Sequence, residues 1–172
     1  MRKFFALMLA ALMLLGTTEA LAEQATTENA VEVAPVENGV AVPFEDYNFQ
    51  IMLPGDWNML EVSDEDAQTG VIYKCANPES TRALTIAYTE LDEATDMAGV
   101  EAELAAVYEN VQALTINDIS FVSYDIAEQD VTGIVTLGGS GVGLYQFVFY
   151  PASDADYGPL ALQIAASITS IQ

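Results

Sequence analysis

The chain has 172 residues, and its 26 acidic residues against four lysines and arginines give a formal net charge of −22. This charge excludes nucleic acids and anionic membrane surfaces as partners, because both bind through basic side chains that neutralise phosphate groups. The chain has no histidine, which excludes serine–histidine and cysteine–histidine catalytic sets, histidine acid–base chemistry and almost all zinc sites.

Residues 1–22 have the features of a signal peptide. Arg2 and Lys3 precede the apolar run FFALMLAALMLLG, and residues 20–22 (ALA) form the small-x-small pattern of a cleavage site. The run is shorter than the roughly 20 apolar residues of a membrane span, although an uncleaved anchor is the alternative. No cysteine directly follows it, which excludes a lipid anchor. We predict cleavage after Ala22 and a secreted (extracellular or periplasmic) protein.

Residues 23–43 form an acidic, alanine- and valine-rich segment with no basic residue, no aromatic residue and no sustained periodicity. This composition predicts a flexible spacer. We therefore expect one domain over residues 44–172.

The first half of this domain predicts four strands. Phe49, Ile51 and Leu53 alternate with polar or flexible residues up to the turn at 54–56. Trp57 follows that turn, and we expect it to cover the edge of the core rather than to bind a ligand. Further strands are predicted over 57–62, 71–76 and 82–90, with an acidic loop over 63–70.

The second half predicts a helix, three strands and a final helix. Apolar residues at three- and four-residue steps indicate a helix over 96–112, with Asp96 as its N-cap. Strands follow over 119–126, 130–137 and 143–150, and their short links require antiparallel neighbours. A helix within 153–172 ends the chain. The order β-β-β-β-α-β-β-β-α predicts an α+β fold, with one antiparallel sheet and helices packed on it.

Two motifs resemble catalytic or phosphate-binding features but lack the partners these need. The segment LGGSGVG (137–143) is followed by Leu144, where a phosphate loop needs its last glycine, so we interpret the segment as a hairpin. Cys75 is the only cysteine, which excludes an intramolecular disulfide, and a nucleophilic thiol normally needs a base such as histidine. A small apolar residue on a strand is the preferred interpretation of Cys75, with an intermolecular disulfide or a reactive thiol as the alternatives.

Carboxylates are the only candidate metal ligands. The segment SDEDAQTG (63–70) resembles a calcium loop, but Thr69 and Cys75 stand where an EF-hand needs glycine and glutamate. A weak, irregular calcium site could use Asp64, Asp66, Asp92 and Asp96. Carboxylate pairs for glycoside hydrolysis cannot be identified among so many acids.

Five segments resemble the PsbP-like superfamily, which also includes the Ran-binding nuclear import factor Mog. They are FQIMLPGDW (49–57), ALTIAYTE (83–90), the expected helix around Leu104 to Val111, YQFVFYP (145–151) and ALQIAASITSI (161–171). The resemblance covers residues 44–172. It implies an α/β/α sandwich and a role in binding or assembly without catalysis.

These observations favour an exported, non-enzymatic binding or accessory domain with no cofactor, whose partner is an unknown protein or small ligand. A weak divalent cation (calcium) binding protein is the alternative. A small hydrolase is the least favoured function.

Overall fold

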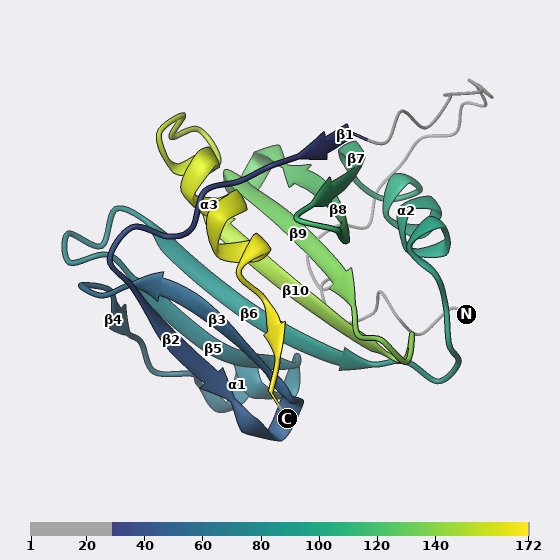
Figure 1. Cartoon of the computed structure of the whole chain (residues 1–172), viewed down its shortest axis with the longest axis horizontal. Helices are drawn as coiled ribbons and strands as arrows, with labels where there is room; N and C mark the ends of the chain where they lie inside the picture. Colours follow the sequence, from purple (N-terminus) through teal and green to yellow (C-terminus); the bar gives the residue numbers. More distant parts are fainter. Residues whose placement is uncertain (1–28, 172) are drawn as a thin grey trace.

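The computed structural model describes residues 29–171 as an α+β fold with two sheets (Figure 1). The larger sheet contains, in spatial order, β1 (Asn29–Val31), β7 (Glu109–Ile116), β8 (Ile119–Ile126), β9 (Val131–Leu137), β10 (Gly143–Tyr150), β6 (Ala83–Glu90), β5 (Val71–Ala76) and β4 (Asn58–Met59). The smaller sheet contains β11 (Thr169–Ser170), β3 (Phe49–Pro54) and β2 (Gly39–Phe44). Strand pairs are antiparallel except β1 with β7.

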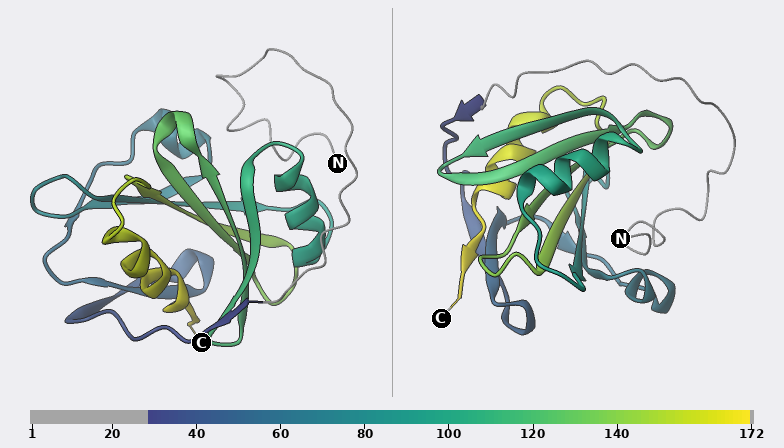
Figure 2. Two further views of the ribbon diagram at one scale, coloured as in Figure 1. Left: turned by 90° about the horizontal axis from the view of Figure 1, so that it is seen from above. Right: turned by 90° about the vertical axis from the view of Figure 1, so that its right-hand side faces the viewer.

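Three α-helices and two single turns of 3-10 helix complete the described chain: α1 (Asp64–Gln68), α2 (Met97–Ala105), α3 (Tyr157–Ala166), η1 (Glu45–Tyr47) and η2 (Ala127–Gln129). The helix α3 and the smaller sheet pack on one face of the larger sheet, and α2 packs on the other (Figure 2). The layers are therefore those of a sandwich, as predicted. None of the helices within residues 29–171 is long and apolar enough to cross a membrane.

The main core lies between the larger sheet, the smaller sheet and α3. Leu84 and Ile86 of β6 and Phe147 and Phe149 of β10 point into it, and each is 0–1% exposed. Burying each of these side chains contributes about 1.5–3 kcal/mol. Because side chains alternate along a strand, residues 85, 87, 146 and 148 point to the opposite face of the sheet. That opposite face carries the candidate site.

A smaller core lies under α2, where Val100 and Leu104 pack against Val122, Tyr124 and Val135. As predicted, Asp96 caps this helix, since its side chain accepts a hydrogen bond of 2.8 Å from the backbone N–H of Gly99. The helix itself was predicted too long. It ends at Ala105, and β7 begins at Glu109. Asn110 has a φ of 53°, which an α-helix cannot include.

The prediction of a flexible spacer was wrong for residues 29–43. The strand β2 pairs with β3 from Gly39↔Pro54 to Phe44↔Phe49, and Val36 is buried in the main core. The domain therefore begins before Phe44. The rest of the predicted spacer, like the predicted signal peptide, lies outside the described residues.

Three further predictions need correction. The expected acidic loop contains the helix α1, which begins at Asp64 because Ser63 and Asp66 form a capping box. The expected strand over 57–62 is reduced to β4. The single predicted sheet is accompanied by a second, smaller one. In contrast, β5, β8 and β10 have the predicted bounds, and residues 138–141 form the predicted hairpin turn, with Gly141 at a φ of +70°.

Candidate functional site

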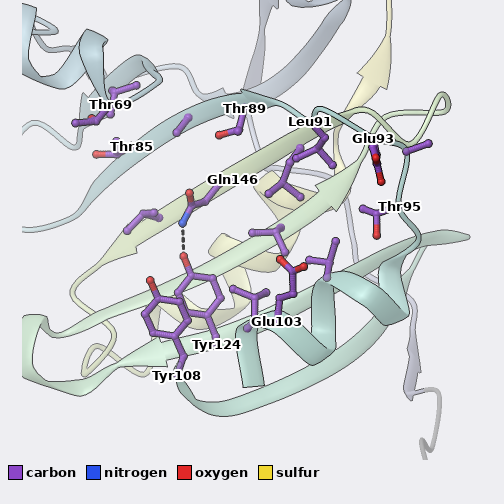
Figure 3. Close-up of a pocket in the computed structure, with 18 residues that line it drawn as sticks. Thr69, Thr85, Thr89, Leu91, Glu93, Thr95, Glu103, Tyr108, Tyr124 and Gln146 are labelled. Atoms are coloured by element: carbon purple, nitrogen blue, oxygen red, sulfur yellow. Dashed lines mark hydrogen bonds between the residues drawn. The ribbon is translucent and has the colours of Figure 1, made fainter. Parts of the chain in front are cut away.

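A groove crosses the open part of the larger sheet, on the face that carries α2. The helix α2 contacts β7 and β8, so the outward side chains of β6 and β10 remain uncovered. On β6 these are Thr85, Ala87 and Thr89, whose small side chains leave an open hollow above the strand. The groove has a volume of about 190 Å³. Figure 3 shows these strands as its floor and α2 as one wall.

The lining is largely apolar, with hydrogen-bonding groups at intervals. Apolar side chains come from β5, β6, β9 and β10, from α2 and from the loop before it: Val71, Ala87, Leu91, Ala94, Val100, Leu104, Val135, Leu144 and Val148. Polar side chains come from the strands, the loop before α2 and the segment after α1: Thr69, Thr85, Thr89, Thr95, Tyr108, Tyr124 and Gln146. A concave apolar surface with a few polar groups is the usual composition of a small-molecule site.

A tyrosine pair closes one side of the groove. The rings of Tyr108 and Tyr124 are stacked, with centroids 4.4 Å apart and planes 22° apart. The side-chain amide of Gln146 on β10 donates a hydrogen bond to the hydroxyl of Tyr124 on β8 (Figure 3). The Tyr124 hydroxyl can reach across β9 to Gln146 because Gly133, on β9 between β8 and β10, has no side chain. Burial raises the pKa of Tyr124 and that of Tyr108, so both hydroxyls are neutral at physiological pH.

Two carboxylates line the side of the groove formed by α2 and the loop before it. Glu93 comes from the loop before α2, and Glu103 rises from α2 toward the strands (Figure 3). Within residues 29–171 the lysine and the arginine are both paired elsewhere. Lys74 lies 3.1 Å from Asp66, and Arg82 lies 2.7 Å from Asp154. The groove therefore combines an apolar floor with an acidic edge that no basic side chain of the described chain neutralises.

The carboxylates proposed for calcium have structural roles or separate positions. Asp66 is held by Lys74 and by the capping box with Ser63, and these hydrogen bonds keep the pKa of Asp66 below its usual range. Asp96 caps α2. Asp64 lies in α1, and Asp92 lies exposed in the loop after β6. Among residues 29–171, no three acidic or cysteine side chains lie close enough to hold a metal ion.

Cys75 lies in the main core, not at a surface. It is 0% exposed, and burial raises the pKa of its thiol to about 12. A thiol in this environment is protonated at physiological pH and is a poor nucleophile. This position agrees with the interpretation of Cys75 as a small apolar core residue.

A second hollow of about 430 Å³ lies beside the 138–141 hairpin and the C-terminal residues 168–171. Three tyrosines border it, but they pack against one another: the ring centroids of Tyr47 and Tyr88 are 5.0 Å apart, and those of Tyr88 and Tyr145 are 5.3 Å apart. The hydroxyl of Tyr145 also donates a 3.0 Å hydrogen bond to the backbone of Tyr47. The lining of this hollow is mainly polar, whereas that of the groove over β6 and β10 is mainly apolar, so the groove is the stronger candidate for a small-molecule ligand.

None of the residues predicted from the sequence as candidate ligands lines the groove. A usable signal was present in the alternation of β6 and β10, where small or polar residues at 85, 87, 89 and 146 alternate with large apolar ones. That alternation shows that one face is buried. It does not show which part of the other face a helix covers.

No protein-family model matches the chain, and no curated protein matches it. Solved structures do. The chain is similar to the solution structure of cyanobacterial PsbP (CyanoP) from Synechocystis sp. PCC 6803, with a TM-score of 0.57 and 15% sequence identity over 77% of this chain and 92% of that one. It is also similar to a crystal structure from Bacteroides thetaiotaomicron, with a TM-score of 0.50 and 16% identity over 73% of this chain and 46% of that one. These likenesses establish a PsbP-like fold.

Proposed function

We propose that the chain is an exported, non-enzymatic binding domain that holds a small, largely apolar ligand in the groove over β6 and β10. The observation that carries this proposal is the groove itself. The part of the sheet face that carries Ala87, Leu144 and Val148 is open, whereas α2 buries the neighbouring part of the same face. An open apolar hollow is costly in water, which favours an occupant.

A binding role without catalysis agrees with the side chains present. The chain has no histidine, and Cys75 is buried with its thiol protonated. The hydroxyls of Tyr108 and Tyr124 have raised pKa values, so neither is an activated nucleophile. The resemblance to PsbP-like domains also implies binding or assembly support. The proposed export rests on the predicted signal peptide.

The test is a thermal-shift screen of small apolar compounds against residues 23–172, followed by calorimetric titration of each hit. A ligand that binds the folded state raises the melting temperature by mass action. Ala87→Phe places a ring on the groove floor and should abolish binding. Ala41→Phe, on the exposed face of β2, is the matched control and should leave binding unchanged. Hits that bind Ala87→Phe as tightly as the native protein would contradict the proposal.

Export is tested separately by expressing the full chain in a bacterium. The protein recovered outside the cytoplasm is then measured by intact-mass spectrometry. The expected mass is that of a chain beginning at Glu23. Ala22→Leu should block processing, since the peptidase accepts a small residue before the cut. Leu21→Met, one position earlier, should be processed normally. A protein that retains residues 1–22 would favour the uncleaved anchor.

A further inference from the structure

We infer that the ligand of the groove is an organic cation with an apolar body, such as an alkylammonium, whose positive group lies between Glu93 and Glu103. This inference rests on the proposed function, because it names the ligand class of the same groove. It follows from the distribution of charge around an apolar hollow.

The lining of the groove presents negative charge and no positive charge to a ligand. Its lining contains two carboxylates, Glu93 and Glu103, and no lysine or arginine. Both carboxylates belong to the side of the groove formed by α2 and the loop before it, whereas Thr69 and Thr85 lie at the far end (Figure 3). The groove therefore carries its negative charge along the side formed by α2 and the loop before it, whereas neutral threonine hydroxyls lie at both of its ends.

The described part of the chain supplies no counter-charge to the acidic side of the groove. In the part of the chain that the structure describes, Lys74 and Arg82 are the basic residues, and both make ion pairs at other sites. The formal net charge of −22 adds a long-range negative potential to the local one. An anionic amphiphile such as a fatty acid is repelled by this field, and a cation is attracted.

The volume of the groove limits the size of its ligand. A volume of about 190 Å³ lies below the roughly 300–1,000 Å³ of pockets that enclose drug-sized molecules. It suits a single alkyl chain or a small ring. Placed along the floor, such a body contacts Ala87 and Val148, and its charged end reaches the carboxylates.

The experiment compares three probes with the same alkyl chain and different head groups: n-octylammonium, n-octanol and octanoate. Calorimetric titration at low salt is expected to give the order ammonium, then alcohol, then carboxylate. Methylammonium, which keeps the charge and lacks the chain, should not bind measurably. Raising the ionic strength should weaken ammonium binding and leave the alcohol unchanged, because salt screens the exposed carboxylates.

Charge variants locate the head group. Glu93→Gln and Glu103→Gln should each weaken n-octylammonium binding by about two- to fivefold, which is the range of exposed ion pairs, and should leave n-octanol binding unchanged. Glu101→Gln is the matched control. It changes the net charge equally on the same helix, but Glu101 does not line the groove, so binding should be unaffected.

The outcomes separate the inference from the proposed function. If all three octyl probes bind equally and Ala87→Phe abolishes their binding, the groove is a ligand site and the charge inference is wrong. If Glu101→Gln weakens ammonium binding as much as Glu93→Gln, the attraction is that of the whole surface and the inference is again wrong. If no octyl probe binds the native protein, both the inference and the proposed function fail.

Discussion

The ring of Tyr124 lies over Gly133 on the neighbouring strand, in the space that the Cβ atom of any other residue would occupy. This relationship brings the Tyr124 hydroxyl to Gln146 on the next strand and fixes the side of the groove that the tyrosine pair forms. Tyr124 is only 1% exposed. The ring therefore has little room to move aside.

Gly133→Ala should consequently destabilise the protein. The added methyl group overlaps the ring of Tyr124, and overpacking of a filled core costs about 1–3 kcal/mol. The free energy of unfolding, measured by urea denaturation, should fall by that amount. The near-ultraviolet circular dichroism of the tyrosines should change as well, because the stack with Tyr108 is disturbed.

Gly139→Ala provides the control for the same chemical change. A Cβ atom at Gly139 meets nothing within 4 Å, so its effect should stay within about 0.5 kcal/mol. Equal effects of the two substitutions would show that glycine flexibility, not the space over Gly133, determines the outcome.

Trp57 packs against the edge of the main core, with its ring centroid 6.0 Å from that of Tyr157. This agrees with its predicted structural role. Tyr157 is itself fixed, since its hydroxyl donates a 2.9 Å hydrogen bond to the backbone of Ala83. Trp57→Ala should lower the free energy of unfolding by about 2–3 kcal/mol, below the 3–5 kcal/mol typical of a fully buried tryptophan, because Trp57 is only half-buried.

Trp57→Phe keeps an aromatic ring at this position and should cost about 1 kcal/mol. Neither substitution should change ligand binding, since Trp57 does not line the groove. A loss of binding without a loss of stability would assign Trp57 to a ligand site.

Cys75 makes the free energy of unfolding depend on pH in the alkaline range. Its pKa is raised by burial from 9.0 to about 12, so the unfolded chain loses the thiol proton at a lower pH than the folded protein does. The contribution of Cys75 to stability is therefore fully present below about pH 9 and is lost as the pH rises toward about 12. The stability difference between the native protein and Cys75→Ala should shrink over that range.

The difference between the two proteins is the useful quantity, because it removes the contributions of Tyr108, Tyr124 and Tyr145, whose pKa values are raised without any influence of Cys75. The pKa values of Tyr73 and Tyr157 are raised by burial and in part by Cys75, so their change on substitution belongs to the effect of Cys75. A thiol reagent supplies the control. The folded protein should react slowly near neutral pH, and the protein in concentrated urea should react rapidly. Rapid reaction of the folded protein would show that Cys75 is accessible.

The sequence contained enough information for the strands that local signals define. Residues 71–76, 119–126 and 143–150 are bounded by turn residues and have the predicted ends. The helix after Asp96 was identified for the same reason, but its end was not, because Tyr108 and Val111 continue the apolar spacing into β7. In the structure both residues pack against the smaller core under α2.

The features that depend on distant partners could not be predicted. The parallel pairing of β1 with β7 joins residues 29–31 to 114–116, and nothing local to either segment indicates it. The groove depends on how much of a sheet face α2 covers, which tertiary packing decides. Its acidic edge likewise combines Glu93 and Glu103 from different elements.

Residues 36–43 have the composition of a spacer, but the structure places them in the fold. Substitutions at Val36 and Val40 test which of the two describes the protein in solution. Val36 is 6% exposed, whereas Val40, four residues later, is 55% exposed. Val36→Asp should lower the free energy of unfolding by about 3 kcal/mol or more, since it buries an unpaired charge in the main core. Val40→Asp should cost at most about 1 kcal/mol, the loss of strand propensity at an exposed position. Urea denaturation of the two variants decides the matter: if both are neutral, residues 36–43 behave in solution as the spacer that their composition predicts, and the domain begins near Phe44.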